Sequence, residues 1–145
     1  MNAKIVDLMV ESVMTASVHQ TVGHVKKVMA KHNISCMPVT NTEGELSGIV
    51  TTTDVLQHAK ETSPISQIMS KKVFTVPQYS DPSLAARVMR NHHIHHVVVT
   101  HEKQIVGILS TFDLLKLVED HRFVMKNAPT PSKKTGGKRK KQELG

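Results

Sequence analysis

Apolar side chains recur at helical spacing in two segments of the chain. Val22, Val25 and Met29 lie on one helix face. Thr21, directly before them, can cap that helix with its hydroxyl. Residues 81–89 repeat the pattern with Asp at the cap position and Pro in the first turn, where its missing N–H is harmless. The spacing predicts two amphipathic helices of the same kind.

Short apolar runs bounded by turn residues predict strands around these helices. The predicted strands cover residues 13–16, 37–40 and 46–50 in the first half and 73–76, 97–100 and 105–109 in the second. Each third strand leads into a further predicted helix, at residues 52–59 or 111–118. Each half is therefore expected to form a β-α-β-β-α unit, in a mixed α/β (α+β) protein.

The two halves are copies of one sequence. At an offset of 60, ten pairs are identical: Ile5/Ile65, Met9/Met69, Val13/Val73, Thr15/Thr75, Val28/Val88, Met29/Met89, His32/His92, Ile34/Ile94, Val39/Val99 and Thr40/Thr100. After a one-residue shift in a polar turn, five more pairs match at an offset of 59: Gly48/Gly107, Ile49/Ile108, Thr52/Thr111, Asp54/Asp113 and Leu56/Leu115. Agreement in this order indicates a duplicated unit of about 55–60 residues.

The repeat predicts the domain organisation. We expect the first copy at residues 1–62, the second at 63–122 and a tail at 123–145. A three-stranded sheet with two short helices leaves one sheet face uncovered, so neither copy is expected to fold alone. The copies are expected to pack together about a pseudo-twofold axis and to leave two equivalent clefts between them.

Composition argues against several classes of protein. Aromatic residues make up 3% and Trp is absent, so the core must be aliphatic. No apolar run approaches the roughly 18–20 residues that span a bilayer, and Asp7 and Glu11 interrupt the place of a signal-peptide core. The single cysteine, Cys36, allows neither an internal disulfide nor a Cys-rich zinc site. These features favour a cytoplasmic protein without a membrane span.

The basic charge is concentrated in the tail. Of the formal net charge of +7, residues 126–145 carry +6, through seven Lys/Arg and one Glu. The tail has no apolar pattern and is expected to be disordered. It can bind a polyanion weakly by counterion release, but it lacks aromatic residues for stacking on bases. A solubilising role fits the same composition.

Both copies place the motif Gly-x-x-Thr/Ser-x-x-Asp where the third strand meets the second helix. Gly48 and Gly107 leave room for a ligand or for another stretch of backbone. The hydroxyl and the first N–H groups of the helix suit an anion, and Asp54 or Asp113 can accept hydrogen bonds from both hydroxyls of a ribose. The same spacing also describes a helix capping box, which needs no ligand. Spacing alone leaves both interpretations open.

With these features the copies resemble cystathionine-β-synthase (CBS) motifs. Over roughly residues 5–120, the chain resembles a stand-alone CBS pair, or Bateman module. The resemblance rests on the strands around Thr15 and Thr75, the helix ends at Met29 and Met89, residues 36–39, and the two Gly-x-x-Thr/Ser-x-x-Asp motifs. It implies regulatory binding of an adenosine-containing ligand, either AMP, ADP or ATP or S-adenosylmethionine, and a homodimer. The second copy departs from the family's typical Pro, present as Pro38, with Val98.

The resemblance also implies the residues of each site, because sites in this family mix the two copies. One site would contain Ser12, Met14, Ile34, Ser35, Ile108, Ser110 and Asp113, with His95 and His96 facing phosphates. The other would contain Ile49, Thr51, Thr53, Asp54, Lys72, Phe74 and Ile94. The phosphate-side positions of the Asp54 site are the uncharged Ser35 and Cys36, so the Asp113 site is expected to hold phosphates better.

Four imidazoles lie between residues 92 and 96. They can bind a metal, contact a phosphate or form a solvated turn. The segment runs from a helix through a turn into a strand, so no regular face presents all four, and no neighbouring Cys or carboxylate completes a ligand set. We expect no metal site here. Since no motif arranges a nucleophile, we expect no catalytic residue and no enzyme.

Two hypotheses for the function remain. The first is a regulatory module that senses an adenosine-containing ligand in clefts between its two motifs and acts on an effector protein. The alternative is a ligand-free interaction scaffold whose basic tail binds nucleic acid or an acidic partner.

Overall fold

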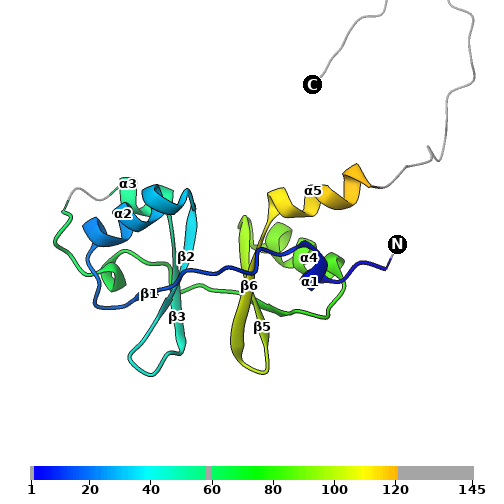
Figure 1. Ribbon diagram of the computed structural model, residues 1–145, viewed down its shortest axis with the longest axis horizontal. Coiled ribbons are helices and arrows are strands. Elements are labelled where there is room, and N and C mark those ends of the chain that lie inside the picture. The colour runs from blue at the N-terminus through cyan, green and yellow to red at the C-terminus, as the bar shows by residue number, and fades with distance from the viewer. Residues whose placement is uncertain (1, 58–59, 121–145) are drawn as a thin grey trace, which may run out of the picture.

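The chain forms two three-stranded sheets that lie next to each other, each covered by its own helices (Figure 1). The computed structural model describes residues 2–57 and 60–120. The tail expected at 123–145 lies outside the described residues. The first half contains β1 (Ala16–Ser17), α2 (Val22–His32), β2 (Cys36–Thr40), β3 (Leu46–Thr51) and α3 (Thr52–Leu56). The second contains β4 (Thr75–Pro77), α4 (Pro82–His92), β5 (His96–His101), β6 (Gln104–Ser110) and α5 (Thr111–Glu119).

The two sheets have the same topology, with orders β1-β2-β3 and β4-β5-β6. In each, the first strand is parallel to the second, and the second is antiparallel to the third. Both hairpins have a register shift at the same place, directly after Val39 and after Val99. The predicted β-α-β-β-α units and their duplication are confirmed.

Capping residues fix the ends of the long helices as predicted. The Thr21 side chain accepts a hydrogen bond from the His24 N–H at 3.1 Å, and Asp81 accepts one from the Ser83 N–H at 2.8 Å. Both helices end on a left-handed residue with φ of 54°, Asn33 in α2 and His93 in α4. This sharp turn directs the chain back into the central strand of each sheet.

Two further elements are exchanged between the copies: α1 (Ile5–Leu8) and the 3-10 helix η1 (Ile65–Gln67) each pack against the opposite copy. Ile5 and Leu8 are buried in the core of the second half, and Ile65 is buried in the core of the first. Figure 1 shows α1 beside α4, far from the sheet that follows it in the sequence. The boundary expected near residue 62 follows the duplication, whereas α1 and η1 each pack in the core of the opposite half; as a domain boundary it stays a prediction.

The exchanged segments continue along the third strand of the opposite half. Val10 pairs with Ile108, and Ser70 pairs with Ile49, each as an isolated antiparallel bridge. A Cβ on Gly48 would lie 2.8 Å from the Ser70 carbonyl oxygen, and one on Gly107 would lie 3.0 Å from that of Val10. Of the two interpretations of these glycines, the structure supports the close approach of another backbone.

No helix in the described part of the chain has the length and apolar character needed to cross a membrane.

Candidate functional site

Two clefts of about 320 and 330 Å³ open between the halves, one at each Gly-x-x-Thr/Ser-x-x-Asp motif. Both volumes lie within the 300–1,000 Å³ that is typical of small-molecule sites. The Asp54 cleft is lined by Ser35, Ile49, Thr51, Thr52, Thr53, Asp54, Ser70, Lys72, Val73, Phe74, Ile94, His95 and His96. The Asp113 cleft is lined by Val10, Ser12, Val13, Met14, Asn33, Ile34, Ser35, Cys36, His96, Ile108, Ser110, Phe112 and Asp113.

Each aspartate is the third residue of a helix and uses one carboxylate oxygen to cap the start of that helix. Asp54 Oδ2 accepts the Thr51 N–H at 2.9 Å and the Thr51 hydroxyl at 3.1 Å. Asp113 Oδ2 accepts the Ser110 N–H at 2.9 Å and the Ser110 hydroxyl at 3.0 Å. Both motifs are therefore capping boxes, and both also line clefts. The two interpretations that spacing left open are compatible.

The second oxygens, Oδ1, have different surroundings. Asp54 Oδ1 has no hydrogen bond or ion pair with any described residue. Asp113 Oδ1 lies 3.8 Å from the ammonium of Lys116, which also donates a hydrogen bond to the Leu8 carbonyl at 3.1 Å. Asp113 is only 7% exposed. Lys116 thus connects the capped end of α5 to the exchanged helix α1.

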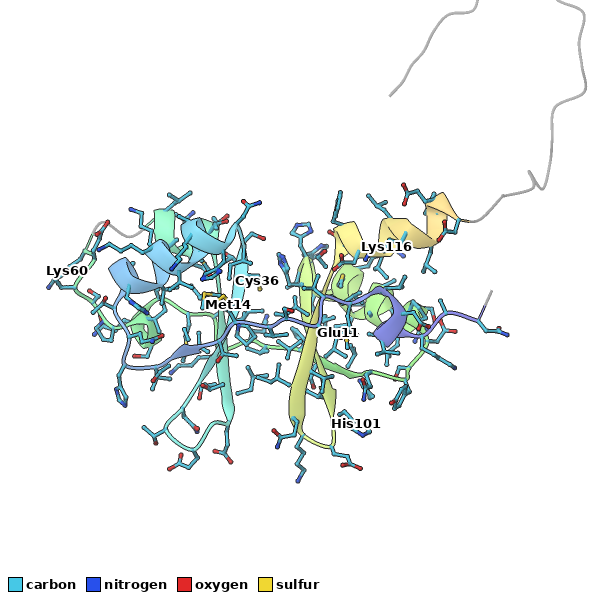
Figure 2. The ribbon with its side chains drawn as sticks, viewed as in Figure 1. Glu11, Met14, Cys36, Lys60, His101 and Lys116 are labelled. Atoms are coloured by element: carbon cyan, nitrogen blue, oxygen red, sulfur yellow. The ribbon has the colours of Figure 1, made fainter. Side chains whose placement is uncertain are left out.

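The structure gathers the predicted site residues into two groups, and each group contains residues of both copies. All seven residues assigned to the Asp54 site line that cleft. Eight of the nine assigned to the Asp113 site line the other cleft. Figure 2 labels one of them, Met14, and also Cys36, which lines the same cleft, at the junction of the two halves. This placement tests proximity only; contact with a ligand stays a prediction.

His95 is the exception, because it lines the Asp54 cleft and not the Asp113 cleft. His96 reaches both clefts. The placement of His95 differs from the expectation, which put both imidazoles at the Asp113 cleft; their contact with phosphates stays a prediction.

The sequence prediction missed the lining residues on the exchanged segments. Val10 and Ser70 line opposite clefts at equivalent places, 60 residues apart. Their repeat relationship was visible in the sequence, but their place depends on the exchange of α1 and η1. Phe112 was also missed. It lies two residues beyond the capping Ser110 and is 77% exposed.

The four imidazoles between residues 92 and 96 have separate surroundings. His92 stacks on Phe74 with ring centroids 4.0 Å apart, and His93 forms the left-handed end of α4. His95 and His96 line the clefts as described. Within residues 2–57 and 60–120, no three His, Cys, Asp or Glu side chains are grouped so that they could hold a metal ion.

Burial changes the acidity of two groups at the clefts. Desolvation raises the pKa of the Cys36 thiol to about 12, with a smaller contribution from the Asp54 carboxylate. The thiol is therefore protonated at neutral pH and is a poor nucleophile. Desolvation also lowers the pKa of His96; His95 acts in the same direction and Asp113 in the opposite one. His96 is mainly neutral at pH 7 and can donate or accept a hydrogen bond.

Comparison with known proteins gives relatives of several kinds. Inosine-5'-monophosphate dehydrogenase of Methanocaldococcus jannaschii is 29% identical over 111 residues, covering 76% of this chain and 22% of the enzyme. The CBS domain-containing protein YhcV of Bacillus subtilis is 27% identical over 113 residues, covering 74% of this chain and 80% of YhcV. The chain spans about a third or less of the length of three M. jannaschii proteins that it matches.

Solved structures show the same fold. The CBS domain pair of protein MJ0100, in complex with 5'-methylthioadenosine and S-adenosyl-L-methionine, is similar with a TM-score of 0.75 and 26% identity. The similarity covers 82% of this chain and 98% of that one. The family model of the CBS domain matches residues 5–61 and again residues 65–120. Two tandem copies of that domain, arranged as a Bateman module, make this chain a member of the CBS domain family.

Proposed function

We propose that the chain is a regulatory module that binds an adenosine-containing ligand in the clefts between its two CBS motifs. The observation that carries this proposal is the Oδ1 of Asp54, which has no hydrogen-bond or ion-pair partner in residues 2–57 and 60–120 and lies at the edge of a cleft with apolar walls. A carboxylate oxygen accepts hydrogen bonds from a ribose diol, while Ile49 and Phe74 offer apolar surface to a purine.

The placement of the clefts supports a regulatory role. Each cleft is lined by residues of both halves, so a bound ligand contacts both at once. A ligand that prefers one arrangement of the halves shifts the population towards it. The similarity to a CBS pair that binds two adenosyl compounds supports the choice of ligand class. The chain itself then carries no catalytic residue and transmits the signal to an effector protein.

The isosteric variants Asp54→Asn and Asp113→Asn test the proposal. An amide oxygen can still cap the helix, whereas the amide nitrogen replaces the oxygen that would accept a ribose hydroxyl. A hydrogen bond to a charged group contributes about 1.5–3 kcal/mol, so each variant should weaken binding in its own cleft at least about tenfold. Calorimetric titration with adenosine, ATP and S-adenosylmethionine measures this loss.

Glu43→Gln is the matched control, since Glu43 is exposed in the β2–β3 turn and lines neither cleft. Its affinities should equal those of the wild type. The absence of saturable binding of all three compounds at millimolar concentration would contradict the proposal. The ligand-free alternative depends on the tail, which lies outside the described residues.

We also propose that the module forms a homodimer through the helices α3 and α5. Their outer surfaces expose apolar side chains, including Leu56 at 73% and Leu115 at 54%, which are equivalent positions of the repeat. Figure 1 shows both helices along the same side of the molecule. A second copy related by a twofold axis would cover both with the same surface.

Leu115→Glu should convert the dimer to a monomer, because it places a charge in the apolar interface. Multi-angle light scattering after size exclusion gives the mass directly. Glu119→Gln, near the end of the same helix, should leave the mass unchanged. A wild type that is monomeric at about 100 μM, well above the Kd of a specific interface, would rule the dimer out.

A further inference from the structure

Most lining residues of the two clefts occupy equivalent positions of the repeat. Residues that occupy equivalent places have the same or similar chemistry at the capping box, where Thr51 matches Ser110 and Asp54 matches Asp113. At six other places they differ; the pairs, with the Asp54 cleft first, are Thr53 and Phe112, Ser70 and Val10, Lys72 and Ser12, Phe74 and Met14, His95 and Ser35, and His96 and Cys36. All of these pairs except Thr53 and Phe112 lie on the side of the cleft that the opposite half contributes.

These differences separate the basic groups between the clefts. The Asp54 cleft contains the ammonium of Lys72 and two imidazoles, whereas in the Asp113 cleft His96 is the only basic side chain among the described lining residues. Because His96 lines both clefts, it does not distinguish them, and the contrast rests on Lys72 and His95. Both are exposed, so an anion can reach them without the burial of an unpaired charge.

The aspartates reinforce this contrast. Asp113 Oδ1 already lies near the ammonium of Lys116, whose position is fixed by a hydrogen bond to the Leu8 carbonyl. That ammonium points to the exchanged helix α1 and is not among the residues that line the cleft. The Lys72 ammonium is held by neither a hydrogen bond nor an ion pair with a described residue, since only its backbone N–H has a partner, the Ser70 hydroxyl.

From this we infer that the clefts bind different classes of adenosine compound. The Asp54 cleft takes a phosphorylated one, with Lys72 and His95 as the residues that select phosphate. The Asp113 cleft takes a nucleoside without phosphate, whose 5' substituent contacts the uncharged side chains of Met14, Cys36 and Ser12. This inference rests on the proposed function and assigns a ligand class to each cleft.

An ammonium beside a phosphate forms a charge-assisted hydrogen bond, about twice as strong as a neutral one. Lys72→Ser installs the residue of the equivalent position. We therefore expect it to weaken the binding of ATP about tenfold and the binding of adenosine less than twofold. Calorimetry at low salt measures both affinities, and the loss should shrink as added salt screens the charge. Lys71→Ser is the matched control: Lys71 is exposed and adjacent but lines neither cleft.

The reciprocal exchange tests the Asp113 cleft. In a protein whose Asp54 cleft binds weakly because of Asp54→Asn, the added substitution Ser12→Lys should strengthen the binding of ATP about tenfold. It should change the affinity for 5'-methylthioadenosine less than twofold. The far-ultraviolet circular dichroism of each variant verifies that it is folded.

Equal ATP affinities of Lys72→Ser and Lys71→Ser would overturn the inference, as would loss of ATP in Asp113→Asn but not in Asp54→Asn. In either case binding of adenosine would persist, and the proposed function would stand. A wild type that binds none of adenosine, 5'-methylthioadenosine and ATP would instead remove the proposed function and the division between the clefts with it.

Discussion

Residues 31–40 and 91–100 occupy equivalent places in the two halves and are buried to the same degree at every position. The three central strand residues are fully buried in both, and the residues before them are exposed or half-buried in the same order. The exposed and half-buried residues differ most in chemistry, as in Ser35 and Cys36 against His95 and His96. Close packing restricts the volume of a buried side chain, whereas a cleft residue is restricted only by what it binds. The two halves thus keep one frame and two different cleft surfaces.

Two buried pairs do differ, Met37 against Val97 and Pro38 against Val98, and for the second pair the backbone shows the consequence. The Val98 N–H donates a hydrogen bond to the Phe74 carbonyl at 3.0 Å, whereas Pro38 has no N–H to donate. Accordingly, β4 begins at Thr75 but β1 begins one equivalent place later, at Ala16. The pairing of β4 with β5 therefore starts one residue closer to the cleft than the equivalent pairing of β1 with β2.

The largest effects are expected from truncating the buried residues of the exchanged segments, and these losses of stability can be compared between the two halves. Ile5 is fully buried in the second core and Ile65 in the first, and truncating a buried Ile to Ala costs about 2–5 kcal/mol. We expect Ile5→Ala and Ile65→Ala to lower the free energy of unfolding by similar amounts within that range, measured by urea denaturation. The exposed Gln67 in η1 supplies the control, as Gln67→Ala should change stability by no more than about 0.5 kcal/mol. A negligible loss for Ile5→Ala alone would show that α1 is dispensable to the second core.

A substitution at position 38 or 98 makes the two halves alike at this place in the central strand. Val98→Pro removes the bond to the Phe74 carbonyl, which should destabilise the protein by about 1–3 kcal/mol because a carbonyl loses its partner. Pro38→Val should have a smaller effect and let β1 extend by one residue towards Met14. Amide hydrogen exchange would detect a newly protected N–H at position 38. If that N–H exchanges freely while the one at Val98 is protected, a cause other than proline limits β1.

The smallest expected effect concerns His96, which lines both clefts. Its pKa is lowered in the folded state, chiefly by burial, from the ordinary value of 6.5. Below pH 6.5 the unfolded chain therefore binds more protons at this position than the folded one, so stability falls as the pH drops from 6.5 towards the lowered pKa. The urea midpoint of the wild type should drop more between pH 7.5 and 5.5 than that of His96→Gln. Identical drops would show that His96 is not desolvated in solution.

Several parts of the fold followed from the sequence because their causes are local. Thr21 and Asp81 cap their helices where predicted, and the hairpins follow from apolar runs separated by turn residues. The elements α1 and η1 are too short for a helical period, and their burial depends on the opposite half of the chain. No local pattern encodes that partner.

The residues of the site could also be predicted from the sequence only in part. The family resemblance placed residues of both copies in each cleft, and the clefts contain them. The place of His95 was not predictable from composition, because it depends on how the chain enters β5 between the two clefts. Together with Lys72, His95 gives the Asp54 cleft more basic side chains than the described lining of the Asp113 cleft has.

The burial of Ile5 in the core of the second half and of Ile65 in that of the first also bears on the origin of the chain. A single ancestral unit would have left its own core incomplete and its first residues without a place to pack. Two such molecules could have completed each other by swapping those residues, as in a domain-swapped pair. Duplication within one gene would then have joined partners that already depended on each other, after which each cleft could change on its own.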